Sequence, residues 1–382
     1  MVVKTILPGQ TIGIIGGGQL GRMMAIAAKE MGYKIAVLDP TKNSPTGQIA
    51  DMEVVAPFHD LDAAKRLAET SDIITYEFEN IDVGVLAWLE DHAYLPQGSE
   101  LIRTTQDRAY EKEAIEKSNA KVVPYYLVNT LEDLTKATQI IGIPSVLKTR
   151  RGGYDGKGQV MIRDEADVKE AKTLLKYGPC ILEKFLDFEQ EISVVVNRSV
   201  AGETKAFPVA ENIHVDHILM QSIVPARISE NIKTQAESLA INLAESMQMV
   251  GTLGVEMFLT RDGDIFINEL APRPHNSGHY TMNGCNTSQF EQHIRAICNW
   301  PLGSTKLIDP IVMMNILGEH MEKTIEAIPQ FDSCKLHLYG KDEVKHKRKM
   351  GHLNILGEDV ESIIEKINTL TIWLPDKQEA KQ

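Results

Sequence analysis

The sequence has few cysteines, and their spacing excludes two common kinds of site. Four occur among 382 residues, far apart in the chain, and no pair forms a CxxC motif. Neither a zinc site of the usual spacing nor a disulfide framework is therefore expected. The prediction is a set of small, buried, reduced side chains at Cys180, Cys285, Cys298 and Cys334.

Three further absences narrow the class of protein. No apolar run approaches the ~20 residues that a membrane-spanning helix needs, and the N-terminal residues lack the apolar stretch of a signal peptide. The GxxxxGK(S/T) motif of P-loop proteins is also absent. Basic residues are outnumbered, and the formal net charge of −13 argues against a general nucleic-acid-binding role. A cytosolic protein is expected, with neither nucleic acid nor a membrane as its partner.

What the sequence does contain is a hairpin pattern with opposed carboxylates. Asp262 and Gly263 are typical of a two-residue type I′ turn, and residues 255–260 and 264–268 on either side are rich in strand formers. In that register Glu256 faces Glu269. Like charges at opposed positions repel, so the pair needs a cation or a shared proton unless it lies on a solvated face. Mg²⁺ fits, because it is usually held by one or two carboxylates together with substrate phosphates.

The segment after this hairpin is rich in groups that recognise ligands. Prolines at positions 272 and 274 prevent the strand from continuing. Binding residues concentrate on loops that rigid elements hold in place, so we expect a site here. Its candidate side chains are Arg273, His275, Asn276, Ser277 and His279.

Three domains are predicted from the order of these patterns. Residues 1–108 alternate strands and helices, as in a Rossmann-like α/β domain. Residues 109–305 form two α+β lobes, about 120–185 and 186–305, which are expected to close on a nucleotide. Residues 306–382 form a small β-rich domain.

The elements that support this division are expected at the following positions. Strands are predicted at 11–15, 34–39, 72–76, 121–128, 143–150, 180–186, 189–196, 206–210, 218–223, 308–317, 336–339 and 353–356. Helices are predicted at 22–31, 61–69, 110–117, 131–141, 231–247, 289–298 and 358–370. His214 is expected between two strands.

Two glycine-rich segments suggest phosphate binding. The first, residues 16–21 (the glycine turn), has GxGxxG spacing at the start of a helix, with Asp39 ending the next strand. Such a turn can hold any phosphate, so it does not by itself require a dinucleotide. Glu77 and Glu79 follow a strand at the edge where open parallel sheets bind ligands, and a solvated loop or a helix cap is the alternative for them. The second segment, residues 152–158 (the glycine loop), follows Lys148, and its backbone N–H groups are free to approach an anion.

Together these motifs resemble the ATP-grasp enzymes, and within them the family of N5-carboxyaminoimidazole ribonucleotide synthases. The resemblance covers nearly the whole chain in the expected order. It rests on Lys148, the glycine loop, residues 183–186, Glu256 with Asn268 and Glu269, residues 268–279, and residues 339–352 of the C-terminal part.

The resemblance implies a ligase of de novo purine (IMP) synthesis. ATP would phosphorylate bicarbonate to carboxyphosphate. The amine of 5-aminoimidazole ribonucleotide would then capture the carboxyl group, or CO₂ released from it, to give N5-carboxyaminoimidazole ribonucleotide, ADP and phosphate. The implied cofactors are ATP and Mg²⁺, with Mn²⁺ as a substitute, and the implied assembly is a homodimer.

The resemblance also assigns residues to each ligand. The ATP site would comprise Arg108, Lys148, Gly153, Tyr154, Asp155, Gly156, Lys157, Gly158, Gln159, Glu183, Lys184, Phe185, Leu186, Glu191, His214, Asn268 and Glu269. The metal would lie on Glu256 and Glu269, although strict alternation sends the Asn268 side chain to the opposite face of the strand. The ribonucleotide would be bound by Gln19, Leu20, Glu77, Lys341 and Arg348, the last two beside the glycine turn as a seat for the 5′-phosphate.

Three residues are implied in catalysis. Arg273 can grip a carboxylate or a phosphate with its planar guanidinium. His275 could orient bicarbonate or shuttle a proton. Tyr154, in the glycine loop, could reach the substrate when that loop closes and excludes water.

Other functions remain open at this stage. An ATP-grasp ligase could act on a different ribonucleotide or on formate, because few residues set substrate choice. A nicotinamide-dependent dehydrogenase would rest on the glycine turn and Asp39 alone. A regulatory nucleotide-binding protein without turnover would leave Arg273 and His275 without a role. A solvated surface hairpin is the alternative for the basic segment 341–349.

Overall fold

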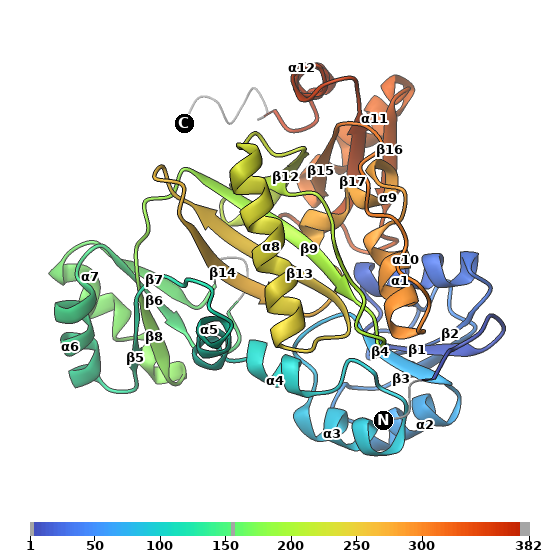
Figure 1. Cartoon of the computed structure of the whole chain (residues 1–382), viewed down its shortest axis with the longest axis horizontal. Helices are drawn as coiled ribbons and strands as arrows, with labels where there is room; N and C mark the ends of the chain where they lie inside the picture. The colour runs from blue at the N-terminus through green and yellow to red at the C-terminus, as the bar shows by residue number, and fades with distance from the viewer. Residues whose placement is uncertain (1–3, 154–156, 375–382) are drawn as a thin grey trace.

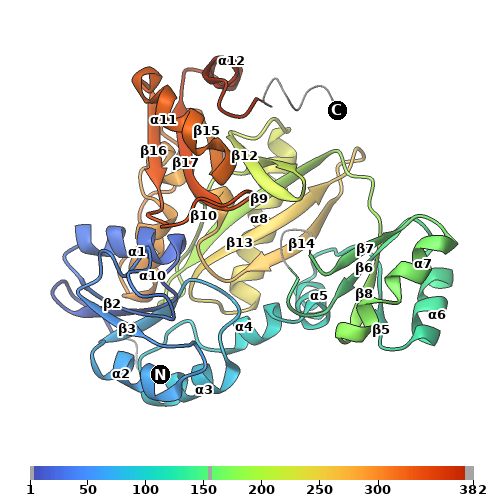
Figure 2. The same ribbon diagram turned by 180° about the vertical axis from the view of Figure 1, so that it is seen from behind.

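Three β-sheets organise the chain. The computed structural model describes residues 4–153 and 157–374, which are drawn from opposite sides in Figures 1 and 2. A parallel sheet near the N-terminus and a small antiparallel sheet lie at different places around one large antiparallel sheet. Within the described ranges no helix is long and apolar enough to cross a bilayer.

The N-terminal sheet is parallel, with strand order β3-β2-β1-β4. Its central strands are buried along nearly their whole length, as expected for a parallel sheet covered on both faces. The strands are β1 (Thr11–Ile15), β2 (Lys34–Asp39), β3 (Met52–Val55) and β4 (Ile73–Tyr76). The helices are α1 (Gln19–Glu30), α2 (Leu61–Glu69) and α3 (Val83–His92). Helix α1 begins within the glycine turn, earlier than predicted.

The small sheet forms a lobe of its own, visible at the left of Figure 1. Its order is β5-β8-β6-β7, and helices α4 and α5 lead into it from the N-terminal sheet. Its strands are β5 (Tyr125–Val128), β6 (Ser145–Thr149), β7 (Gln159–Ile162) and β8 (Cys180–Lys184). The helices are α4 (Glu100–Thr105), α5 (Arg108–Lys117), α6 (Leu131–Ile141) and α7 (Glu165–Ala171). The glycine loop joins β6 to β7, so it lies at one end of this sheet.

The large sheet combines the second lobe with the C-terminal strands. Its order is β14-β13-β9-β11-β12-β15-β17-β16, with β10 paired to β9. The second-lobe strands are β9 (Gln190–Arg198), β10 (Thr204–Ala206), β11 (Ala210–Val215), β12 (Ile218–Val224), β13 (Gly251–Leu259) and β14 (Ile265–Ala271). The C-terminal strands are β15 (Ile311–Leu317), β16 (Cys334–Leu338) and β17 (Lys349–Leu356). Pairing of β12 with β15 makes the two parts one continuous sheet.

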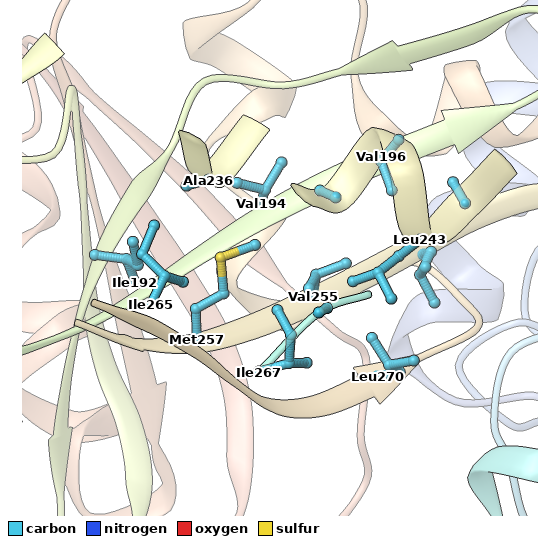
Figure 3. Packing of buried hydrophobic residues seen from close by; sticks show 14 of the residues in the cluster. Ile192, Val194, Val196, Ala236, Leu243, Val255, Met257, Ile265, Ile267 and Leu270 are labelled. Carbon is cyan, nitrogen blue, oxygen red and sulfur yellow. The ribbon is translucent and has the colours of Figure 1, made fainter. Parts of the chain in front are cut away.

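Helices cover this sheet and fill its core. Figure 3 shows side chains of helix α8 packed against strands β9, β13 and β14. The buried face of α8 includes three alanines, which let the helix approach the sheet closely. The helices of this region are α8 (Glu230–Ser246), α9 (Thr281–Gly284), α10 (Gln289–Ile297), α11 (Met321–Ala327) and α12 (Val360–Leu370).

Two predicted features of this region are wrong. Residues 206–210 do not form one strand, because Pro208 has no N–H to donate and lies between β10 and β11. His214 does not lie between strands but on β11, whose final residues pair with β12 through an irregularity at Ile213 and His214.

The hairpin of β13 and β14 has the predicted carboxylate pair but not the predicted turn. Its loop has three residues, 261–263, because Thr260 pairs with Asp264 and Gly263 donates to the Thr260 carbonyl at 3.0 Å. Only Gly263 in this loop has a positive φ, +83°, so the type I′ turn is wrong. Met257 then pairs with Ile267, one residue out of the predicted register.

A bulge restores the expected pairing further along. The partner of Met257 is Ile267, whereas the partner of Glu256 is Glu269, so Asn268 is an extra residue in β14. The bulge also changes the direction of the Asn268 side chain, whose amide nitrogen lies 3.5 Å from the Glu256 carboxylate. Strict alternation, which would send Asn268 to the other face, does not hold here.

Candidate functional site

Two opposed carboxylates lie at the end of the β13–β14 hairpin. Glu256 and Glu269 are cross-strand partners. Burial, followed by the charge of Glu269, raises the pKa of Glu256 to about 7. His275 Nε2 lies 3.3 Å from Glu256 Oε1. The pair is thus short of positive charge, which a bound cation would supply.

The described residues suit a cation that brings further ligands with it. Within residues 4–153 and 157–374 no group of three or more His, Cys, Asp or Glu side chains is placed to hold a metal ion. Two carboxylates with hard oxygen atoms fit Mg²⁺, which commonly completes its shell with substrate phosphates and water. The site fits a metal–nucleotide complex better than a metal alone.

Helix α5 contributes two residues beside Glu269. Arg108 Nη1 lies 3.8 Å from Glu269 Oε2. Glu111 is buried and accepts a hydrogen bond from the Leu270 N–H at 2.7 Å. Burial and the neighbouring Glu269 raise the pKa of Glu111 to about 8. Sequence reasoning missed Glu111, because a Glu within a charged helix carries no sign that it is buried.

A buried ion triad lies in the small sheet and on helix α5. Glu183, on β8, is 2.7 Å from Lys148 Nζ and 3.0 Å from Lys112 Nζ. Burial alone would raise the pKa of Glu183, but the two ammonium groups outweigh it and lower that pKa to about 2. Lys148 and Glu183 were predicted site residues. Lys112 was missed because its contact with Glu183 depends on how helix α5 packs against the small sheet.

The glycine loop is tied to helix α5 at its start. Arg150 makes two hydrogen bonds to Asp107, at 2.8 and 3.0 Å, and the Arg150 carbonyl accepts from the Arg108 N–H at 3.0 Å. A Cβ on Gly153 would lie 3.5 Å from Arg108 Nη2, so this part of the loop runs against the Arg108 guanidinium. At the other end, Gln159 pairs with Lys148.

The remaining residues of the glycine loop are placed as follows. Gly158 has a φ of +72° and gives its carbonyl to the Thr149 N–H at 2.8 Å, and Lys157 precedes it. The predicted residues Tyr154, Asp155 and Gly156 lie outside the described residues.

The segment after β8 crosses from the small sheet to the large one. The Lys184 N–H donates to the Pro124 carbonyl at 2.9 Å, and the Phe185 N–H donates to the Pro144 carbonyl at 3.1 Å. These two N–H groups are therefore engaged within the protein. Phe185 is 39% exposed, and Leu186 follows it toward β9.

An acid–histidine pair lies on the large sheet. His214 Nδ1, on β11, is 2.7 Å from Glu191 Oε2, on β9. Burial lowers the pKa of His214, but the Glu191 carboxylate outweighs burial and raises it above its usual value. Glu256 lies close enough to contribute to the same shift, so both residues belong to one electrostatic site with the carboxylate pair.

The glycine turn binds carboxylates of the protein itself. Glu77 accepts hydrogen bonds from the N–H groups of Gly18 and, at 2.6 Å, Gly21. Asp39 accepts from the Gly17 N–H at 2.7 Å. Because these three N–H groups already donate to carboxylates of the protein, they cannot bind the 5′-phosphate as predicted. Gln19 and Leu20, in the first turn of α1, lie beside them.

Residues from all three parts of the chain meet beside this turn. Arg273, after β14, is 2.7 Å from Glu79 of the N-terminal domain. Lys341 donates to the Lys349 carbonyl at 2.7 Å. Burial, and then the charge of Arg348, lower the pKa of Lys341 to about 8, while Glu77 opposes the shift. The basic segment is therefore not only a solvated hairpin.

The loop after Arg273 divides between the site and the core. His275 faces Glu256, and burial holds its pKa well below the usual range. Ser277 contacts the His275 ring at 2.8 Å. His279 instead packs on His352, with ring centroids 4.7 Å apart. The side-chain amide atoms of Asn276 are buried without a hydrogen-bond partner among the described residues, so only part of the predicted cluster reaches the site.

Three family models match consecutive parts of the chain. A ribonucleotide synthetase preATP-grasp domain matches residues 9–106, and an ATP-grasp domain matches residues 113–290. A phosphoribosylaminoimidazole carboxylase C-terminal domain matches residues 311–366. Together these matches cover the N-terminal sheet, both lobes and the C-terminal strands.

Characterised relatives resemble the chain over nearly its whole length. An N5-carboxyaminoimidazole ribonucleotide synthase of Bacillus subtilis is 55% identical over 96% of this chain and 97% of the relative. An ADP complex of an N5-carboxyaminoimidazole ribonucleotide synthetase superposes with a TM-score of 0.96 at 62% identity, covering 99% of this chain and 100% of that one. An Aspergillus clavatus synthase with ADP and 5-aminoimidazole ribonucleotide has a TM-score of 0.89 at 32% identity, covering 94% and 97% of the two chains.

The buried triad generates a stability prediction. Glu183→Gln leaves two buried lysines without their counter-charge and should lower the free energy of unfolding by about 3–5 kcal/mol at pH 7. A carboxylate with a lowered pKa stabilises the fold fully above its unfolded pKa and loses that effect as the pH falls toward 2. The difference between wild type and variant, measured by urea unfolding, should therefore shrink between pH 5 and pH 3. An equal difference at both pH values would contradict the assignment.

Proposed function

The chain belongs to the N5-carboxyaminoimidazole ribonucleotide synthases, a family of ATP-grasp ligases, and we propose how its own residues carry out their reaction. ATP, bicarbonate and 5-aminoimidazole ribonucleotide are converted to N5-carboxyaminoimidazole ribonucleotide, ADP and phosphate in purine biosynthesis. The observation that carries the proposal is the opposed pair Glu256 and Glu269, which lies within reach of Arg108 and His275.

ATP would lie between the small sheet and the large one. Lys148 and Arg108 would hold its phosphates, and residues 153–159, from the glycine loop and the start of β7, would cover them. Lys148 is already poised by Glu183, which supports this role. Residues 183–186 would border the adenine, and Glu191, oriented by His214, would accept hydrogen bonds from the ribose hydroxyls. The two lobes would thus hold opposite ends of the nucleotide.

Mg²⁺, or Mn²⁺ in its place, would be held by Glu256 and Glu269, with Asn268 beside them. When bound, the ion would neutralise charge on the nucleotide phosphates. The raised pKa of Glu256 supports this assignment, because a carboxylate pair short of positive charge gains from a divalent cation. Arg108, close to Glu269, would bring the phosphates to the same place.

The phosphoryl group would pass to bicarbonate at this point. An oxygen of bicarbonate attacks the γ-phosphorus, the bond to ADP breaks, and carboxyphosphate forms. Arg273, oriented by Glu79, would hold the carboxylate of bicarbonate, and His275 would hydrogen-bond to it. Tyr154 of the glycine loop would help to exclude water from the labile intermediate.

The ribonucleotide would bind where the three parts of the chain meet. Lys341 and Arg348 would hold its 5′-phosphate beside Gln19 and Leu20. Glu77 would face the sugar and base, held by the glycine turn. The exocyclic amine attacks the carboxyl carbon, phosphate leaves, and the nitrogen loses a proton.

We also propose that the protein is a cytosolic homodimer, as the family resemblance implies. Light scattering coupled to size-exclusion chromatography measures the mass of the particle directly.

The direct test of the function is ADP release in the presence of ATP, Mg²⁺ and bicarbonate. Strong stimulation by 5-aminoimidazole ribonucleotide is expected, because the amine consumes the intermediate. Bicarbonate-dependent release without such stimulation would keep ATP-grasp chemistry but reject the ribonucleotide. No ADP from folded protein would reject an enzyme altogether.

The metal assignment predicts the effect of Glu269→Ala. Loss of one carboxylate should abolish ADP release while leaving the circular dichroism spectrum unchanged, because Glu269 is partly exposed and its truncation leaves no large cavity. Glu230→Ala, an exposed change in the first turn of α8, is the matched control and should retain full activity. Near-normal turnover of Glu269→Ala at saturating Mg²⁺ would show that Glu269 does not hold the metal.

The lowered pKa of Lys341 predicts how ribonucleotide binding depends on pH. A lysine with a pKa of about 8 loses its charge as the pH rises through 8, and a neutral amine binds phosphate poorly. The KM for the ribonucleotide should therefore rise between pH 7 and pH 9, whereas the KM for ATP should not follow it. Lys341→Arg keeps the charge and should flatten the profile; a rise of the same size in that variant would exclude Lys341 as its cause.

A further inference from the structure

A chain of polar side chains leads from His275 into the large sheet. His275 Nδ1 lies 2.8 Å from Ser277 Oγ, and Ser277 Oγ lies 2.8 Å from Ser193 Oγ. Asn212 follows, with Nδ2 2.8 Å from Ser193 Oγ and Oδ1 2.8 Å from Ser222 Oγ. The serines and Asn212 are buried, so their hydrogen bonds must be satisfied within the protein.

The strand pairing places this series of polar side chains beside the carboxylate pair. Ser193 on β9 is the cross-strand partner of Glu256 on β13. Asn212 on β11 pairs in register with Ser222 on β12. Ser193, Asn212 and Ser222 have no assigned contact with ATP, the metal or the ribonucleotide. Hydrogen bonds connect them to the site through Ser277 and His275.

The direction of the hydrogen bonds fixes the tautomer of His275. The backbone N–H of Ser277 points at His275 Nδ1 at 3.4 Å, and a backbone N–H can only donate. The side-chain sequence agrees: Asn212 Nδ2 donates to Ser193, Ser193 donates to Ser277, and the Ser277 hydroxyl is left to donate to Nδ1. Nδ1 is thus an acceptor, and the ring proton lies on Nε2.

The other side of the ring requires the same assignment. His275 Nε2 faces Glu256 Oε1 at 3.3 Å. When Glu256 is ionised, as a metal-binding carboxylate is, a lone pair on Nε2 would face the lone pairs of the carboxylate, whereas an N–H group there faces an acceptor. Donors at Nδ1 and an acceptor at Nε2 therefore specify one tautomer from both sides.

The backbone of His275 is clamped as well. The side-chain amide of Gln289 accepts from the His275 N–H at 2.8 Å and donates to the His275 carbonyl at 2.7 Å. Gln289 is fully buried at the start of α10. Gln289 thus fixes the backbone of His275, and the hydrogen-bonded series Ser277, Ser193 and Asn212 determines which ring nitrogen accepts.

We propose that Ser277, Ser193 and Asn212 are positioning residues that hold His275 as the Nε2–H tautomer, so that His275 serves the carboxylation as a hydrogen-bond donor from Nε2. This inference rests on the proposed function of the site and deepens it. Of the two roles open for His275, orienting bicarbonate or shuttling a proton, it selects the first. An Nε2–H group donates to an oxygen of bicarbonate or of carboxyphosphate, and it has no lone pair at Nε2 with which to remove a proton from the amine.

The tautomer can be measured without substrates. In protein labelled with ¹⁵N-histidine and deuterated, long-range ¹H–¹⁵N correlation spectra distinguish a protonated ring nitrogen from an unprotonated one. The spectrum of His275→Gln lacks the ring signals of His275, and the missing signals identify that residue in the wild type. The expected result is a proton on Nε2 and none on Nδ1. A proton on Nδ1 in the wild type would overturn the proposal, whatever the enzyme assays give.

Asn212→Asp is a nearly isosteric change that should reverse the direction of the hydrogen bonds between residue 212 and His275. An aspartate can only accept, so Ser193 would donate to it, Ser277 would turn to donate to Ser193, and Nδ1 would have to donate to Ser277. We expect the proton to move to Nδ1 and ribonucleotide-dependent ADP release to fall about tenfold or more, with the KM for ATP unchanged. Should Asn212→Asp fail to fold, Ser193→Ala interrupts the chain without adding charge and should lower kcat in the same way.

Controls separate this proposal from the function on which it rests. Ser145→Ala removes another buried serine, in the small sheet outside the chain, and should leave kcat unchanged. His275→Gln retains an N–H donor near the position of Nε2 and should keep more activity than His275→Asn, whose amide lies near Nδ1. Equal loss in the two His275 variants, or full activity in both Ser193→Ala and Asn212→Asp, would overturn the positioning role. Failure of the wild type to release ADP would instead reject the proposed function and leave the NMR result standing.

Discussion

The repulsion between Glu256 and Glu269 is the constraint around which the site is built. Two carboxylates at directly opposed positions of a hairpin destabilise the protein unless a positive charge lies between them. Arg108 lies 3.8 Å from Glu269, and His275, whose pKa burial holds well below its usual range, lies 3.3 Å from Glu256. The protein thus keeps a deficit of positive charge at one place, and a metal–nucleotide complex is the ligand that we propose removes it.

In the proposed mechanism the rest of the fold brings each reactant to this deficit. The small sheet carries Lys148, in contact with Glu183, on the proposed nucleotide side. Glu77, just after β4, and Lys341, between β16 and β17, lie on the proposed ribonucleotide side. The C-terminal strands continue the large sheet through the pairing of β12 with β15, and the loop that carries Lys341 joins β16 to β17, so this loop is attached to the sheet that carries Glu256. Catalysis of phosphoryl transfer is largely positioning and electrostatics, which such a rigid arrangement provides.

The sequence predicted the elements well and the local irregularities poorly. Buried parallel strands, capped helices and the glycine loop all leave clear periodic or compositional signals, and most of these elements lie where they were expected. The pair Glu256–Glu269 was also predicted, but through a wrong turn: the three-residue loop shifts the register by one, and the bulge at Asn268 shifts it back. A bulge inside a strand of ordinary composition has no sequence signal. Glu111 and Lys112 were missed because their burial depends on how α5 packs against two sheets.

We propose that the carboxylate pair and the nucleotide hold one divalent cation together, and Mn²⁺ binding followed by electron paramagnetic resonance can measure this. Free Mn²⁺ gives a sharp spectrum that weakens on binding, so the bound fraction can be counted with and without ADP. We expect weak binding to the protein alone, one tightly bound Mn²⁺ in the presence of ADP, and loss of that tight binding in Glu256→Gln. Equally tight binding by Glu256→Gln, or tight binding that needs no nucleotide, would contradict it.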